Sequence, residues 1–216
     1  MSKIGLPNYT KGEELVNALT HGLGVLFGAL CLLVCLHRSR DTWDTVGSAI
    51  YGGSMILLYA VSTVYHSLGV CAGKKVMRVI DHCSIYFLIA GTYTPILLSA
   101  MRLGFPGWTW TVFGIVWGCA VVGPVFTAMD LKKYARFSMT CYICMGWCIV
   151  MAARPAVLSV PKQALLWILF GGIAYTVGAV LYGIGKTHRY IHGIFHLFVL
   201  MGSALQFLGI AGYILG

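Results

Sequence analysis

Seven apolar runs divide this chain from end to end, and each approaches or exceeds the length that a helix needs to cross a bilayer. They lie near residues 15–36, 45–67, 79–101, 108–128, 135–153, 163–184 and 192–215. A membrane span takes about 20 apolar residues, and in hydrocarbon every backbone polar group must find a partner, as a helix provides. The fifth run is the weakest, because it is short and rich in Cys and Met. We expect an all-α integral membrane protein, a seven-transmembrane helix bundle that forms a single domain over residues 1–216.

Composition supports a multi-pass protein of the cell membrane. Hydrophobic residues make up 59% of the chain and charged residues only 10%, whereas about 25% of a soluble domain is charged. Residues 1–14 are polar and the first apolar run is long enough to span, so we expect no cleavable signal peptide. The net charge of +9 does not indicate a nucleic-acid partner, because the basic residues occupy short loops between apolar runs.

Lysine and arginine are distributed unequally between alternate loops. The N-terminal side carries ten of them: Lys3, Lys11, Lys74, Lys75, Arg78, Lys132, Lys133, Arg136, Lys186 and Arg189. The opposite side carries five: Arg38, Arg40, Arg102, Arg154 and Lys162. Cytoplasmic loops are enriched in these residues. The sequence therefore predicts a cytoplasmic N terminus and, with seven spans, a C terminus outside.

Small residues within the spans have a packing interpretation. Gly24 and Gly28 form one GxxxG pair and Gly114 and Gly118 another, a pattern that lets membrane helices approach closely. The eight cysteines lie almost entirely inside apolar runs, so we do not expect a disulfide framework. Three cysteines share one helix face, and we interpret them as packing residues because no His or carboxylate accompanies them: Cys141, Cys144 and Cys148.

Polar side chains from four of the predicted spans fall at one depth, near the cytoplasmic end. The second span ends in STVYH, the third begins with DH and the seventh begins with HGIFH. The first span carries a stripe at i, i+3 and i+7, which we interpret as a supporting polar network: Glu14, Asn17 and His21. Such residues are costly in hydrocarbon and mark candidate functional sites.

Three histidines are the candidate metal ligands. His192 and His196 are four residues apart, so they share a helix face and can grip one ion. His188 is a further turn away, about 12 Å from His196 along a helix, and lies at the water boundary. His66, at matching depth on the second span, supplies the third ligand. Three His ligands with an open fourth position are typical of catalytic zinc.

Two further residues fit hydrolytic chemistry at such an ion. Asp81 is placed to act as general base toward the water in the open position, and Ser62 lies one turn from His66, where its hydroxyl could orient water or a substrate carbonyl. Each residue also has a structural interpretation. A membrane histidine is often a hydrogen-bonded packing residue, Asp81 could be the N-cap of the third span, and serine commonly bonds between membrane helices.

Four segments carry a resemblance to a known family: ELVNALTH (14–21), STVYH (62–66), DHCSIYFLIAGTYTP (81–95) and HGIFH (192–196). They resemble the signature segments of the hemolysin III family, the bacterial branch of the progestin and adipoQ receptor (PAQR) group, which is related to alkaline ceramidases. The resemblance covers nearly the whole chain. It implies a seven-helix bundle with a cytoplasmic N terminus and a zinc ion held by His66, His192 and His196, with Asp81 beside the metal.

Three functions are compatible with these sequence features. The leading hypothesis is a zinc-dependent, ceramidase-like hydrolase that acts on a lipid amide or ester from within the membrane. The alternative is a non-enzymatic receptor, ion pathway or regulator of membrane properties, in which zinc only fastens the second, third and seventh spans together. The third is a cytolysin, which we disfavour because an integral protein without a signal peptide has no evident route into a foreign membrane.

Overall fold

The protein is an all-helical bundle in which seven helices are long and apolar enough to cross a membrane. The computed structural model describes residues 5–184 and 188–215, so Lys3, Lys186 and Gly216 lie outside the described residues. The helices are α1 (Lys11–Arg38), α2 (Thr42–Ser67), α3 (Ala72–Pro95), α4 (Pro106–Met129), α5 (Ala135–Gly146), α6 (Ala153–Ser159), α7 (Lys162–Ile184) and α8 (Ile191–Gly209). Two π-helical stretches, Ile96–Met101 and Ile210–Ile214, extend α3 and α8. The expected fold class is confirmed.

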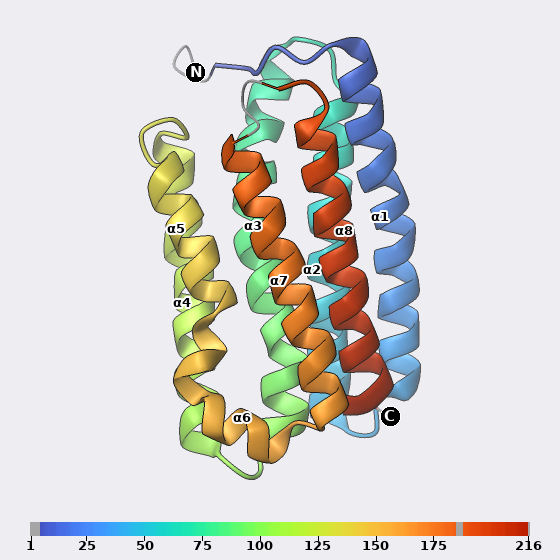
Figure 1. Cartoon of the computed structure of the whole chain (residues 1–216), viewed down its shortest axis with the longest axis vertical. Coiled ribbons are helices and arrows are strands. Elements are labelled where there is room, and N and C mark those ends of the chain that lie inside the picture. Colours follow the sequence, from blue (N-terminus) through green and yellow to red (C-terminus); the bar gives the residue numbers. More distant parts are fainter. Residues whose placement is uncertain (1–4, 185–187, 216) are drawn as a thin grey trace.

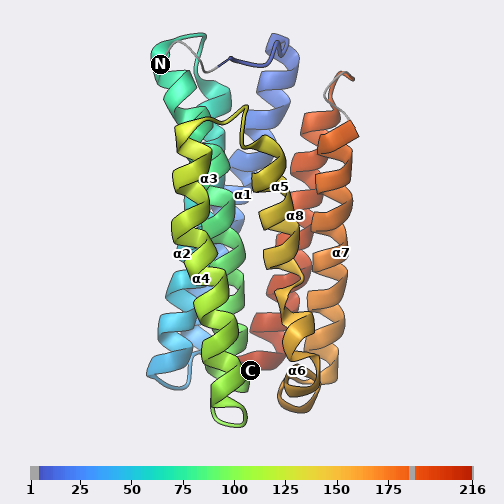
Figure 2. The same ribbon diagram turned by 90° about the vertical axis from the view of Figure 1, so that its left-hand side faces the viewer.

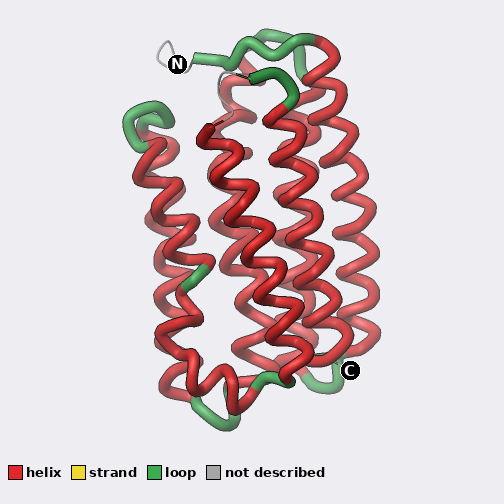
Figure 3. The backbone as a smooth tube through the Cα atoms, in the orientation of Figure 1, coloured by secondary structure: helices red, strands yellow, loops and turns green. Residues whose placement is uncertain are grey.

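The helices run roughly parallel to one long axis, and the described part of the chain begins and ends at opposite ends of the bundle (Figure 1). Helices α1, α2 and α8 pack on one side, α4 and α5 on the other, and α3 and α7 lie between them (Figures 1 and 2). The connections are short at both ends (Figure 3). The described basic residues of the two groups counted above therefore fall at opposite ends of the bundle.

A capping box fixes the start of α1. The Glu13 N–H donates to the Thr10 hydroxyl oxygen, and the Thr10 N–H donates back to the Glu13 carboxylate, at 3.3 and 2.8 Å. Such a reciprocal pair satisfies two of the free N–H groups at a helix N-terminus. The other Glu13 oxygen accepts from the Tyr190 N–H at 3.0 Å, immediately before α8. The first turns of α1 and α8, which carry the polar residues, are therefore held side by side.

Helix α3 begins earlier than the apolar run predicts, at Ala72, because the Cys71 side chain caps it by accepting from the Lys74 N–H. Asp81 consequently lies well inside the helix. The suggestion that Asp81 is the N-cap of this span is wrong.

Glycines set the close approach of α1, α2 and α3. A Cβ added at Gly24 would lie 2.5 Å from the Tyr59 ring, and one at Gly91 would lie 2.1 Å from Ser54 Oγ. The packing role expected for the first GxxxG pair is therefore confirmed. It is wrong for Gly114 and Gly118, since an added Cβ there would meet no described atom within 4 Å.

The fifth span is interrupted, which explains its weak sequence signal. Helix α5 ends at Gly146, a 3-10 stretch covers Cys148–Ala152 and α6 completes the crossing. Tyr93 of α3 repairs the break, because its hydroxyl donates to the Gly146 carbonyl at 2.8 Å and accepts from the Ile149 N–H at 3.1 Å. Irregular backbone at membrane depth is tolerated where protein groups satisfy it in this way.

Candidate metal centre

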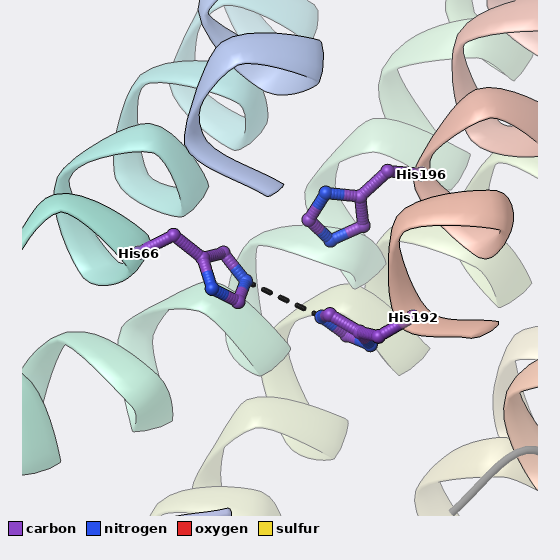
Figure 4. Close-up of side chains that lie close together, drawn as sticks. All are labelled: His66, His192 and His196. Atoms are coloured by element: carbon purple, nitrogen blue, oxygen red, sulfur yellow. Dashed lines mark hydrogen bonds between the residues drawn. The ribbon is translucent and has the colours of Figure 1, made fainter. Parts of the chain in front are cut away.

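His66, His192 and His196 converge at the end of the bundle that holds the first turn of α1. Each contributes one ring nitrogen to a set whose members all lie within 4.8 Å of one another. His66 comes from the last turn of α2, whereas His192 and His196 project from successive turns of α8 (Figure 4). The two Nε2 atoms of His66 and His192 are 3.3 Å apart. The rings thus face a common point between two helices that are far apart in the sequence.

Hydrogen bonds on the outer nitrogens orient two of the three rings. The His66 Nδ1–H donates to the Glu14 carboxylate at 2.6 Å, and the His196 Nδ1–H donates to the Asn17 carbonyl oxygen at 3.3 Å. A neutral imidazole that donates from Nδ1 keeps its lone pair on Nε2. Both Nε2 lone pairs are therefore turned toward the common point, and the stripe on α1 supplies both partners.

Glu14 is itself held by a buried lysine. Lys74 of α3, only 3% exposed, donates from Nζ to the other Glu14 oxygen at 2.6 Å and to the Leu68 carbonyl at 2.8 Å. Its ammonium also lies 5.2 Å from the centre of the Tyr65 ring. The Lys74–Glu14 ion pair and the hydrogen bond from His66 to Glu14 therefore link α3, α1 and α2 behind the first candidate ligand.

His21 lies deeper on the same stripe and packs against the third candidate ligand. Its ring stacks on the His196 ring with centroids 3.5 Å apart and an interplanar angle of 10°. Both nitrogens of His21 are buried and have no hydrogen-bond partner among the described residues. It faces the same cavity as Ser62 and His196.

The three histidines could hold a metal ion, and the one separation between their nitrogens that can be compared directly suits a small tetrahedral cation. With Zn–N distances of 2.0–2.1 Å, two tetrahedral ligands stand about 3.3 Å apart, which is the separation of the His66 and His192 nitrogens. Two lone pairs turned toward each other at this distance repel unless a cation or a proton lies between them. Oriented neutral imidazoles with a carboxylate behind one of them also form the usual outer support of a zinc ligand. His188 is exposed and outside the cluster, as predicted.

Asp81 and Ser62 lie beside the cluster. The Asp81 side chain is 14% exposed and 3.8 Å from His82 Nδ1, and it lines the same cavity as Ser62 and His192. Ser62 Oγ is buried and makes no hydrogen bond to a described residue. All eight residues predicted for the site and its support therefore meet at one end of the bundle.

A cavity of about 1100 Å³ opens beside these residues. Its polar end is lined by Ser62, Asp81 and both histidines of α8, and from there it continues between α3, α5, α7 and α8 along apolar side chains that include Leu88 and Val199. The break at the end of α5 contributes Gly146 and Trp147 to the wall. Two of the three candidate metal ligands, His192 and His196, thus line the cavity directly.

Two residues at the site were not identified from the sequence. Tyr9 precedes α1, and its ring stacks on His192 with centroids 5.2 Å apart. Burial is the main cause that raises the pKa of the Tyr9 hydroxyl, and the nearby Tyr182 and Tyr65 phenols add to it. The hydroxyl therefore stays neutral and can donate a hydrogen bond. Lys74 was counted only as a loop charge. Its one available signal was a cysteine three residues earlier, which could have marked an early start of α3.

Comparisons with known proteins agree with this architecture. A model of the family described as Haemolysin-III related matches residues 9–207. The chain is 38% identical over 208 residues to Hemolysin-3 of Bacillus cereus, covering 94% of this chain and 92% of that protein. It is 40% identical over 210 residues to the Hemolysin-3 homolog of Bacillus subtilis (strain 168), covering 95% and 96%.

A more distant relative comes from animals. The chain is 29% identical over 213 residues to the monocyte to macrophage differentiation factor of Homo sapiens, covering 94% of this chain and 84% of that protein. The match of the family model extends across all four segments that carried the resemblance and across the cluster of histidines. The chain is a multi-pass membrane protein that belongs to the Haemolysin-III related family.

Proposed function

We propose that the protein is a zinc-dependent hydrolase that cleaves an amide or ester bond of a lipid from within the membrane. One observation carries the proposal: two of the three clustered histidines, His192 and His196, line a large cavity together with a carboxylate and an unpartnered hydroxyl. A purely structural zinc site is closed by a fourth protein ligand, whereas a catalytic one keeps that position open. Among the described residues, no fourth His, Cys, Asp or Glu joins the cluster.

The side chains around the cavity supply the other parts of a hydrolytic mechanism. When bound, zinc provides Lewis acidity, which polarises an acyl carbonyl and promotes the ionisation of water. Asp81 accepts the proton that water loses as its oxygen bonds to the acyl carbon. Ser62 donates to the carbonyl oxygen. Asp81 then returns the proton to the departing amine or alcohol as the C–N or C–O bond breaks, and the apolar walls hold the acyl chain.

Asp81→Asn is the sharpest test, because the substitution keeps the shape of the side chain and removes its basicity. We expect the variant to retain zinc and fold and to lose turnover by about 10²- to 10⁴-fold, as is common when a general base is removed. Fatty-acid release would be followed from ceramides, lysolipids and acyl amides, in detergent and in vesicles.

Asp41→Asn is the matched control. Asp41 caps α2 at the opposite end of the bundle by accepting from the Asp44 N–H, and Asn caps a helix nearly as well. Its activity should equal that of the wild type. Zinc-loaded wild type that hydrolyses no member of the panel would contradict the proposal.

The second candidate is a non-enzymatic membrane protein with structural zinc. The ion pair between Lys74 and Glu14 and the hydrogen bond from His66 to Glu14 favour it, because together they join α3, α1 and α2, and a metal on His66 would join α8 to them. Zinc removal would then lower thermal stability sharply, and Asp81→Asn would change nothing in cells. The lytic activity in the names of the Bacillus relatives is a third candidate, and a red-cell lysis assay of purified protein would test it.

A further inference from the structure

We propose that Arg78 binds an anionic group, a carboxylate or a phosphate, in the head of the lipid that enters the cavity. The inference rests on the proposed function in one respect: the same cavity holds the acyl bond to be cleaved. It adds a substrate class, an acyl compound whose negative group lies only a few bonds from the acyl carbonyl. Neutral ceramides and neutral glycerides would then be poor ligands.

Arg78 forms no ion pair with a carboxylate of the described residues, although Asp81 lies one turn further along α3. Arg78 is partly buried and lines the polar end of the cavity. Its Nη1 donates to the Gly5 carbonyl, while Nε is buried and has no hydrogen-bond partner among the described residues. No described carboxylate lies within ion-pair distance of it. A partly desolvated guanidinium with a buried, unpartnered Nε–H and no directly bonded counter-ion is unfavourable, so an anionic ligand would be stabilised at this position.

Arg78 lies on the same helix face as the candidate catalytic groups. Arg78, Asp81 and His82 occupy positions i, i+3 and i+4 on α3 and therefore share a face, and the His82 Nδ1–H donates to the Arg78 carbonyl oxygen at 2.9 Å. Three residues of helix rise about 4.5 Å. An anion at the guanidinium and an acyl carbonyl beside Asp81 could therefore belong to one short lipid head group.

The rest of the cavity mouth is electrostatically compatible with an anion. Lys132 and Arg136 also line it, and neither forms an ion pair with any residue that the structure describes. The acidic groups at the mouth already have partners: Glu13 accepts from Thr10 and Tyr190. Asp130 accepts from the backbone N–H groups of the two residues that follow Leu131.

Membrane topology alone explains exposed lysines at this end but not a partly buried arginine. Lys133 illustrates the difference, since it is exposed, lies 5.2 Å from the Tyr134 ring centre and does not line the cavity. Arginine presents a rigid, bidentate fork that matches carboxylate and phosphate oxygens. Lys133 therefore serves as a control for Arg78: both are positively charged, but only Arg78 lines the cavity.

The test compares the binding of paired probes to the full-length protein in lipid nanodiscs. One pair is N-palmitoylglycine and its neutral amide; the other is lysophosphatidic acid and neutral monoacylglycerol. Binding would be measured with zinc and after chelation, so that the result does not depend on turnover. We expect at least one anionic probe to bind about ten- to a hundredfold more tightly than its neutral partner, the range of a hydrogen bond to a charged group.

The variants then assign the preference to one residue. Arg78→Gln should abolish it with little change in neutral-probe affinity, Arg78→Lys should retain part of it, and Lys133→Gln should leave it intact. Equal affinities within both pairs, binding of no probe, or a preference that survives Arg78→Gln would overturn the inference. If Arg78→Gln does not fold, the wild-type pairs and Arg78→Lys still decide.

Two further measurements, of hydrolysis and of displacement by inorganic phosphate, distinguish this inference from the proposed function and from a simple anion site. Hydrolysis of neutral acyl amides without any anionic preference would keep the hydrolase and overturn the role of Arg78. An anionic preference without hydrolysis would support Arg78 and contradict the hydrolase. Inorganic phosphate that displaces the probes at millimolar concentration would overturn the lipid assignment in favour of a free anion.

Discussion

The hydrogen bond made by the outer nitrogen of a histidine ring determines whether the inner nitrogen carries a lone pair or a proton. His66 and His196 each donate from Nδ1, to a carboxylate and to a backbone carbonyl, so each presents a lone pair at Nε2. His192 has no such bond at Nδ1 and is oriented instead by the Tyr9 ring. The stripe on α1 therefore supplies the support that metal-binding histidines usually have.

The first prediction concerns metal content. Purified wild type should contain about one zinc per chain, because three oriented imidazoles converge within 4.8 Å, and His192→Ala should lose most of it since two ligands hold zinc weakly. His188→Ala is the control, as His188 lies outside the cluster. Elemental analysis measures both. Full zinc content in His192→Ala would show that the ion binds elsewhere.

The second prediction concerns the ion pair behind His66. Lys74→Met should weaken zinc binding about 10- to 100-fold, the usual cost of losing an outer partner of a metal ligand, because Glu14 would lose its contact with the buried ammonium. Glu14→Gln should have a similar effect, and the double variant should be no worse than the worse single one. Competition with a chelator measures the affinities. Additive losses in the double variant would mean that the two residues act separately.

At the scale of elements, apolar length predicts the existence of helices and local caps set their ends. All seven spans form close to their predicted positions, because hydrocarbon leaves the backbone few alternatives. The start of α3 was placed too late, since a cysteine cap and buried Lys74 lie outside the apolar run. The break in α5 could not be predicted either, because it depends on Tyr93 of another helix.

The third prediction tests helix packing with a matched pair of glycines. Gly91→Ala should destabilise the protein by about 1–3 kcal/mol, the usual effect of overpacking, because its Cβ would lie 2.7 Å from Ser54 Cβ as well as against the hydroxyl. Gly118→Ala should be neutral or slightly stabilising, since nothing described lies within 4 Å and Ala favours helix. Thermal unfolding in detergent measures both. Equal stabilities would indicate that α2 and α3 separate easily at this point.

At the scale of the whole molecule, depth predicted the candidate site better than sequence distance could. Residues 66 and 192 are far apart in the chain, yet they lie at a similar depth near one membrane face. Because the spans run roughly parallel, residues at the same depth on packed helices lie close together. Depth carries no lateral information. The stacking of His21 on His196 and the cover that Tyr9 provides were therefore not predictable, since both depend on how the helices are arranged around the bundle axis.

The last prediction concerns which face of the membrane holds the metal cluster. The histidines lie at the same end of the bundle as the loop 130–134, and the described part of the chain ends at the opposite end. Because lysine and arginine favour the first end by ten to five, that end should face the cytoplasm. A cytoplasm-active reporter inserted at 130–134 should be active, and one fused after Gly216 should be silent, while a periplasm-active reporter gives the reverse pattern. The opposite result would place the cavity mouth outside, and lipids of the outer leaflet would then be the ones that reach Arg78.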